Sequence, residues 1–194
     1  MTALDVGLLM LGVTTGLIFA AHGAQKAFGW FGGQGMQGWT GMVASLGFHP
    51  ASLFAWLGML TELVGGLGLA MGVMTSVAAA LIVAQSVVIV FHVHWRHGFW
   101  NTNRGIEYPL LLAVAAVFLG LVGRGTLSID GLISSPLFAA DGGLGPARSM
   151  VPPLTARIAL LLAGAVVGSI ALAAPRLSRS RRSADEVGKG GVTR

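Results

Sequence analysis

Long apolar stretches alternate with short polar segments along most of the chain. Five stretches are long enough to cross a hydrocarbon layer of roughly 30 Å, at about residues 4–21, 51–73, 76–91, 108–122 and 158–174. The second and third are separated by only a few residues, so they are expected to form a tight antiparallel helical hairpin. The pattern predicts an all-α membrane protein with five transmembrane helices.

The composition agrees with a lipid environment. Of the 194 residues 54% are hydrophobic and 10% are charged, whereas an ordinary soluble domain has roughly 25% charged residues. Because the chain contains no cysteine, it carries no cysteine nucleophile and no cysteine ligand for zinc or an iron–sulfur cluster. The lipid bilayer is therefore the first expected partner, and no nucleic-acid partner is expected.

Basic residues at the C-terminal end predict the orientation. Cytoplasmic segments of membrane proteins are enriched in Lys and Arg, and four arginines follow the last apolar stretch: Arg176, Arg179, Arg181 and Arg182. We expect residues 154–175 to form the fifth transmembrane helix and residues 176–194 a basic, disordered cytoplasmic tail. Five crossings then place the N-terminus outside and make residues 133–153 an external loop.

The segment 22–50 between the first two stretches is rich in aromatic residues, which favour the membrane interface. Four of its residues fall on one face of a helix: Met36, Trp39, Val43 and Leu46. This predicts a short helix that lies in the interface or dips back into the membrane. Three glycine pairs at i, i+4 spacing in the chain predict close contacts between helices: Gly12 with Gly16, Gly68 with Gly72, and Gly164 with Gly168.

The titratable residues gather after the first and third stretches. They include all five histidines together with other polar residues: His22, Lys26, His49, His92, His94, Arg96, His97, Arg104 and Glu107. Antiparallel helices place both segments on the same side of the membrane. One end of the bundle should therefore carry the polar chemistry, and the other end almost none.

Helical spacing relates several of these residues. His22 and Lys26 share a face if the first helix continues that far, and could hold a quinone carbonyl, a lipid phosphate or an anionic substrate, or simply meet lipid headgroups. His92 and His94 point to opposite sides of a helix. Their spacing with His97 is not a zinc signature, so no metal site is expected, and no motif supports a haem between His22 and His92.

Glu62 is a carboxylate in the middle of an apolar stretch, where charge is expensive. It is expected to face the bundle interior, either as a proton carrier or ligand-site residue, or as a protonated structural residue. Glu107 stands before Pro109 at the start of a helix, where a carboxylate complements the helix dipole. A capping role is therefore the alternative to ligand binding for Glu107.

Depth in the membrane groups Glu62 with other polar residues. At 1.5 Å per residue, Glu62, Gln85, Thr14 and Thr15 all lie about 14–16 Å from the outer ends of their stretches. We expect Glu62 to bond with Gln85, with one of the threonines, or with water or ligand between them. No cation is expected at that depth, so burial favours the protonated acid. Gln85 and His92 lie on the same face of a helix, which offers a route from this layer to the cytoplasmic end.

Motifs along the chain give a family resemblance. They are His22-Gly23-x-Gln25-Lys26-x-Phe28-Gly29-Trp30-Phe31-Gly32-Gly33, Glu62-x-x-Gly65-Gly66, Val93-His94-Trp95, Gly105-x-Glu107-Tyr108-Pro109 and Gly123-x-Gly125-x-x-Ser128-x-Asp130. Their order and spacing over about residues 4–132 resemble the DoxX family of small bacterial membrane proteins. The resemblance implies a four-helix bundle over residues 1–132, from which the fifth helix and basic tail depart, and a site lined by the matching residues: His22, Lys26, Glu62, His94 and Glu107.

The resemblance also implies a redox role. Related DoxD-type proteins are associated with thiosulfate:quinone oxidoreductase, and actinobacterial DoxX proteins with a membrane oxidative-stress complex that includes a superoxide dismutase and a rhodanese-like sulfurtransferase. We therefore expect a multi-pass subunit or scaffold of such a complex in the bacterial inner membrane, binding a quinone-like or sulfur-containing ligand. The alternative is a stand-alone thiosulfate- or sulfide-type quinone oxidoreductase. Oligomeric state stays open, and a homo-oligomer is compatible with either reading.

The predicted site combines the two arguments. Glu62 is the candidate catalytic residue, as a proton carrier. The candidate ligand-binding residues are His22, Lys26, Gln85, His92, His94 and Glu107. A transporter is disfavoured, because the sequence shows neither an inverted repeat nor matching broken helices.

Overall fold

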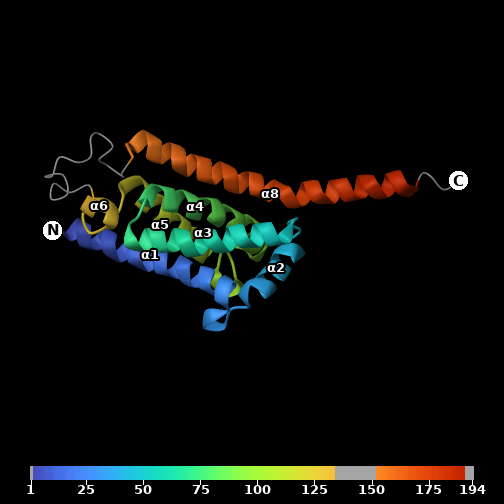
Figure 1. The fold of residues 1–194 in the computed structure, drawn as a ribbon, viewed down its shortest axis with the longest axis horizontal. Helices are drawn as coiled ribbons and strands as arrows, with labels where there is room; N and C mark the ends of the chain where they lie inside the picture. The colour runs from blue at the N-terminus through green and yellow to red at the C-terminus, as the bar shows by residue number, and fades with distance from the viewer. Residues whose placement is uncertain (1, 134–151, 191–194) are drawn as a thin grey trace.

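The computed structural model describes residues 2–133 and 152–190, and its long helices lie side by side along one axis (Figure 1). These helices are α1 (Ala3–Phe28), α3 (Ala51–Met71), α4 (Thr75–Val88), α5 (Glu107–Val122) and α8 (Leu154–Gly190). The short helices α2 (Gly35–Ser45) and α6 (Ile129–Ile133) lie at opposite ends of the bundle. The described part is helical, which confirms the predicted all-α class.

Four helical segments are long and apolar enough to cross a membrane: Ala3–Phe28, Ala51–Met71, Thr75–His97 and Leu154–Ala173. The remaining predicted span is α5, an apolar helix of 16 residues. Large apolar side chains stay exposed on the outside of the bundle, for example Leu111 at 66% and Leu162 at 61%. Lipid is the solvent that suits such a surface, so the chain is a multi-pass membrane protein.

The first helix is longer than its apolar stretch. We predicted a span over 4–21 followed by an interfacial loop from residue 22, but α1 continues to Phe28 and ends at Gly29, which has a left-handed φ of 73°. Residues 22–28 contain no proline and several good helix formers, so nothing stops the helix before that glycine. The extension carries His22 and Lys26 on a rigid helix instead of a loop.

Small residues set the distances between helices. A Cβ added to Gly16 would overlap the backbone of Gly66 and Ala70 on α3, and one added to Gly66 would overlap the backbone of α1. Added Cβ atoms at Gly164 and Gly168 of α8 would overlap carbonyl oxygens of α4. The glycine pairs at 12/16 and 164/168 therefore include true close contacts, as predicted.

Replacing Gly16 with alanine should lower the free energy of unfolding by about 1–3 kcal/mol, because α1 and α3 must move apart. The matched control is Gly7→Ala in the same helix, where an added Cβ meets nothing within 4 Å and should be neutral or slightly stabilising. Denaturant titration in detergent micelles measures both. Equal effects of the two substitutions would show that the α1–α3 contact is not tight.

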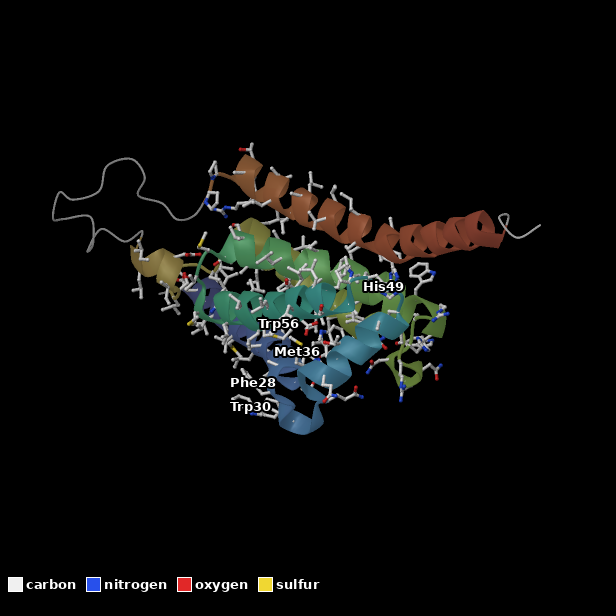
Figure 2. All side chains as sticks on the ribbon, turned by 45° about the vertical axis from the view of Figure 1, so that its right-hand side comes forward. Phe28, Trp30, Met36, His49 and Trp56 are labelled. Atoms are coloured by element: carbon white, nitrogen blue, oxygen red, sulfur yellow. The ribbon has the colours of Figure 1, made fainter. Side chains whose placement is uncertain are left out.

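The short helix α2 packs against the bundle. Its predicted apolar face exists, but that face lies against α3 and the end of α4 in a cluster of partly and fully buried residues: Met36, Trp39, Val43, Leu46, Phe48, Phe54, Ala55 and Val88. The apolar face of α2 therefore packs against the bundle and does not face the surrounding lipid. Phe28 and Trp30 point outward below it in Figure 2 and are both 58% exposed.

The opposite end of the bundle carries buried polar groups, contrary to the prediction that it holds almost none. Arg124 is 2% exposed, and its guanidinium donates to the carbonyl oxygens of Leu8, Leu9 and Ala70. Burial lowers the pKa of the Arg124 guanidinium from its usual value. Gly12 leaves the space that this side chain fills. Arg124 therefore ties α1 to α3.

Asp130 stabilises the same end. Its carboxylate accepts hydrogen bonds from the backbone N–H groups of Met74 and Thr75, at 2.8 and 2.9 Å, and from the Thr75 hydroxyl at 2.7 Å. These bonds satisfy donors at the start of α4. The segment after α5 is thus held against the bundle through Asp130. Most of the predicted 133–153 loop lies outside the described residues.

The last helix also departs from its prediction. We expected disorder after Pro175, but α8 continues to Gly190 and projects beyond the bundle (Figure 1). The tail is polar enough to suggest disorder, yet it is also rich in Arg, which favours helix. Residues 191–194 lie outside the described part.

Candidate functional site

Glu62 lies at the centre of the bundle, on the side of α3 that faces α4. It is 1% exposed. The neighbouring glycines Gly58 and Gly65 allow side chains of α4, including Gln85, to come within van der Waals distance of the α3 backbone. Gln85 Nε2 donates to Glu62 Oε1 at 3.3 Å. This hydrogen bond between α3 and α4 was predicted from the common depth of the two residues in the membrane.

Lys26 is the second partner of Glu62. Its Nζ forms an ion pair with Glu62 Oε1, so the expectation that no cation reaches this depth is wrong. The physical reason is the extension of α1 by seven residues, which brings Lys26 over the bundle, combined with a long side chain that can reach inward. The ion pair gives the Glu62 side chain a cationic partner inside the bundle.

Trp39 completes this group, which we call the Glu62 site: Lys26, Trp39, Glu62 and Gln85. Lys26 Nζ lies 4.2 Å from the centroid of the Trp39 ring, a cation–π geometry. Trp39 Nε1 donates to the carbonyl oxygen of Ala55 at 3.0 Å, which fixes the indole against α3. The predicted threonines do not take part, since Thr14 is exposed and neither Thr14 nor Thr15 bonds to Glu62.

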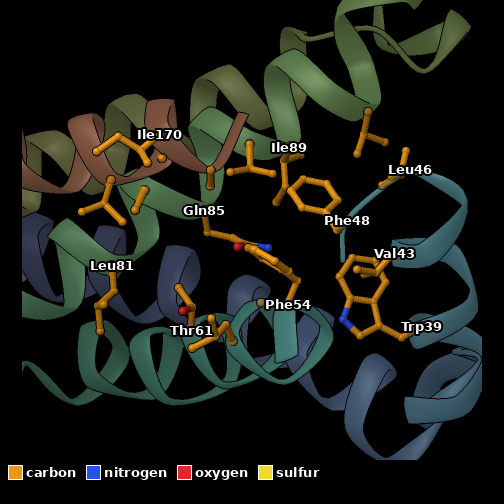
Figure 3. Close-up of a pocket in the computed structure, with 18 residues that line it drawn as sticks. Trp39, Val43, Leu46, Phe48, Phe54, Thr61, Leu81, Gln85, Ile89 and Ile170 are labelled. Atoms are coloured by element: carbon orange, nitrogen blue, oxygen red, sulfur yellow. The ribbon is translucent and has the colours of Figure 1, made fainter. Parts of the chain in front are cut away.

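An apolar cavity of about 440 Å³ lies on one side of the Glu62 site, between α2, α3, α4 and α8 (Figure 3). Its wall is made largely of aliphatic and aromatic side chains, among them Phe48, Phe54 and Ile170. The polar side chains in the wall are Thr61 and Gln85, together with the indole of Trp39. We call this the apolar cavity.

A second, smaller cavity of about 200 Å³ includes Glu62 in its wall. Its wall combines apolar and polar side chains of α1, α3, α4 and α5: Phe19, His22, Glu62, Ser86, Ile89, His94, Tyr108, Pro109 and Leu112. We call it the histidine cavity. Glu62 is thus in the wall of one cavity and hydrogen-bonded to a residue in the wall of the other.

His94 owes its position to a change of helix type. After Val88 the α4 helix continues as a π-helix over Ile89–His94 and a 3₁₀ turn over Trp95–His97, and π-helical turns are frequent at functional sites. His94 Nδ1 lies 2.6 Å from the carbonyl oxygen of Arg104, which holds the ring beside the histidine cavity. His22, the other histidine of this cavity, is 3.1 Å from Gln25 Oε1 through its Nδ1.

Other predicted residues lie elsewhere. His92 packs its ring on Phe48, with centroids 5.0 Å apart, away from the histidine cavity. The Glu107 carboxylate, at the start of α5, accepts from the backbone N–H of Asn101 in the preceding loop at 2.9 Å, and α5 has no side-chain cap hydrogen bond. The structure therefore gathers His22, Lys26, Glu62, Gln85 and His94. It leaves His92 and Glu107 outside this group.

Two residues of this region were not predicted as site residues. Trp39 was assigned only to an amphipathic face, although an aromatic ring near a lysine could have suggested a cation–π contact. Ser86 is 3% exposed and lines the histidine cavity; its position beside Gln85 in an apolar stretch was the available signal. Within the described residues, no three His, Asp or Glu side chains gather closely enough to hold a metal ion.

Comparisons with known proteins agree with the family resemblance. Residues 7–95, which include Lys26, Glu62 and His94, match the family model DoxX. A Bacillus subtilis (strain 168) protein named "Putative oxidoreductase CatD" is 29% identical over 126 residues, which cover 65% of this chain and 86% of that protein. No solved structure matches the chain significantly. The resemblance to DoxX proteins predicted from the motifs is confirmed.

Proposed function

We propose that this DoxX-family membrane protein is the quinone-binding subunit of a bacterial redox system, and that the ligand occupies the apolar cavity. The observation that carries the proposal is the pairing of an apolar cavity with a buried amide and an ion pair beside it. The relative described as an oxidoreductase supports a redox role.

The residues of the apolar cavity fit a quinone-like ligand. Its volume of about 440 Å³ falls among ordinary small-molecule sites, which span roughly 300–1,000 Å³. The side chains of Phe48, Phe54 and Trp39 suit a flat, apolar ring. The amide nitrogen of Gln85 has two N–H donors, of which one bonds Glu62. The second can donate to a ligand carbonyl.

A quinone supplies two-electron, two-proton redox chemistry when bound. In this chain, Gln85 orients a carbonyl oxygen and stands between it and the Glu62 carboxylate. Lys26 holds the negative charge of Glu62 in place while the ring of Trp39 covers the ammonium group. Glu62 is positioned to gain or release a proton close to the cavity, and the surrounding apolar wall excludes water from the ligand.

The proposal also includes the orientation of the protein in the membrane and the role of soluble partner proteins. The Lys26 end of the bundle faces the cytoplasm of a bacterial inner membrane, which is supported by the arginines near the C-terminus. Soluble partners deliver or remove electrons there, because a chain without cysteine has no thiol chemistry of its own. The superoxide dismutase and sulfurtransferase implied by the resemblance are partners of the expected chemical type.

Decylubiquinone should bind the purified protein in lipid nanodiscs and quench part of its tryptophan fluorescence, because Trp39 lines the apolar cavity. Replacing Ala171, which lines the cavity, with phenylalanine should weaken binding at least about tenfold by filling the space. The matched control is Leu162→Phe on the same helix, which faces outward at 61% exposure and should bind as wild type. Equal affinity of the wild type and the Ala171 variant would reject the apolar cavity as the site.

A further inference from the structure

Two buried polar atoms beside the histidine cavity have no hydrogen-bond partner. They are Glu62 Oε2 and Ser86 Oγ, and the parent residues are 1% and 3% exposed. Leaving such an atom unpaired carries the full desolvation cost of a buried polar group. Both residues line the same cavity of about 200 Å³. Water is the usual partner of buried polar atoms that protein groups do not satisfy.

The cavity is large enough and polar enough for this role. A buried water needs about 10–15 Å³ of accessible volume and two to four polar partners, so a volume of about 200 Å³ has room for a short chain of waters. Glu62, Ser86, His22, His94 and Tyr108 all line it and can bond to water.

Exposure changes in one direction along the cavity. His22 is exposed, His94 is half-buried, and Ser86 and Glu62 are buried. The two histidines thus lie where the cavity approaches the polar end of the bundle. Histidine is the side chain that changes charge near neutral pH, so both can pass protons between bulk water and a water chain.

We propose that the histidine cavity is a hydrated proton-exchange site that connects the aqueous phase to Glu62 Oε2. A proton enters at His22 or His94 and moves along the waters. It binds Glu62 Oε2 to give the neutral acid, while Lys26 keeps its own proton; the reverse sequence returns the proton to the aqueous phase. This replaces the predicted route from Gln85 to His92, because His92 packs on Phe48.

The charged and titratable groups around Glu62 come from three elements. Lys26 and His22 face it from α1, His94 from the π-helical continuation of α4, and Tyr108 from α5. Lys26 contacts Oε1, which leaves Oε2 as the oxygen open to the waters. The transfer of this proton from Glu62 onward to a ligand rests on the proposed quinone site. The hydration of the histidine cavity does not depend on that proposal.

The natural absence of cysteine allows a direct test of hydration. A single thiol is introduced as Ser86→Cys, and the exchange of its S–H hydrogen for deuterium is followed by infrared spectroscopy after transfer to D₂O. The matched control is Ser76→Cys, because Ser76 lies on the same helix at 4% exposure but outside the cavity. A second pair on α5 compares Leu112→Cys, in the cavity wall, with Leu119→Cys, which is fully buried outside it.

We expect each cavity thiol to exchange at least about tenfold faster than its control, because the control must wait for local opening of the helix. Exchange as slow as the control in both cavity variants would overturn the proposal. The α5 pair decides the question if Ser86→Cys fails to fold. Decylubiquinone binding is measured separately, so a dry histidine cavity with intact quinone binding would reject only this inference.

Discussion

Replacing Lys26 with methionine should lower the free energy of unfolding by about 3–5 kcal/mol, because it leaves a buried carboxylate without its counter-charge. Glu62 is 1% exposed, and its other hydrogen-bond partner is the neutral amide of Gln85. Methionine keeps most of the apolar stem of lysine and its packing against Trp39, so the loss comes mainly from charge. Reversible unfolding by denaturant in detergent micelles measures the effect.

The double variant Lys26→Met, Glu62→Gln provides the control. Glutamine is neutral and keeps its hydrogen-bonding groups, so the double variant should recover more than half of the lost stability. Glu62→Gln alone should fold better than Glu62→Leu, since leucine leaves the Gln85 amide unpaired. A loss below about 1 kcal/mol for Lys26→Met would mean that the pair behaves as an exposed surface pair.

Replacing Arg124 with methionine should lower the free energy of unfolding by about 3–4 kcal/mol, because three buried or partly buried carbonyl oxygens lose a charged donor. These belong to Leu8, Leu9 and Ala70, so the substitution removes a contact that joins α1 to α3 at the end opposite Lys26. Methionine also leaves part of the guanidinium space beside Gly12 empty. The same unfolding assay applies.

The matched control for Arg124 is Arg96→Met. Arg96 is exposed, so its replacement should change stability by no more than about 0.5 kcal/mol. If both substitutions had the same small effect, the bonds from Arg124 would contribute nothing net to holding α1 and α3 together.

The number of long helices could be predicted from the length of the apolar stretches alone. Their ends could not, because a helix stops where backbone conformation demands it and not where hydrophobicity falls. The apolar stretch ends at residue 21, but α1 stops only at the left-handed Gly29. Similarly, the burial of Arg124 could not be predicted, because only tertiary folding shows that Gly12 leaves a space for its side chain.

The candidate site could be predicted in part for the same reason. Counting residues along straight helices places Glu62 and Gln85 at the same depth in the membrane, and the structure contains the hydrogen bond between them. Lys26 was correctly assigned to the polar end of the bundle. Its contact with Glu62 could not be predicted, because it depends on a long side chain that reaches inward from a helix longer than expected. The position of His94 in the wall of the histidine cavity depends on a π-helical turn that sequence spacing does not reveal.

The shortness of α5 has a consequence for the surrounding bilayer. Its 16 residues span about 24 Å, less than the roughly 30 Å of a typical hydrocarbon core. Such hydrophobic mismatch is relieved by local thinning of the lipid layer. Because α5 begins beside the histidine cavity, with Tyr108 and Pro109 in its wall, thinning draws the headgroup region toward Glu62 on this flank. The thickness of the host membrane then becomes a determinant of how far a proton must travel to reach it.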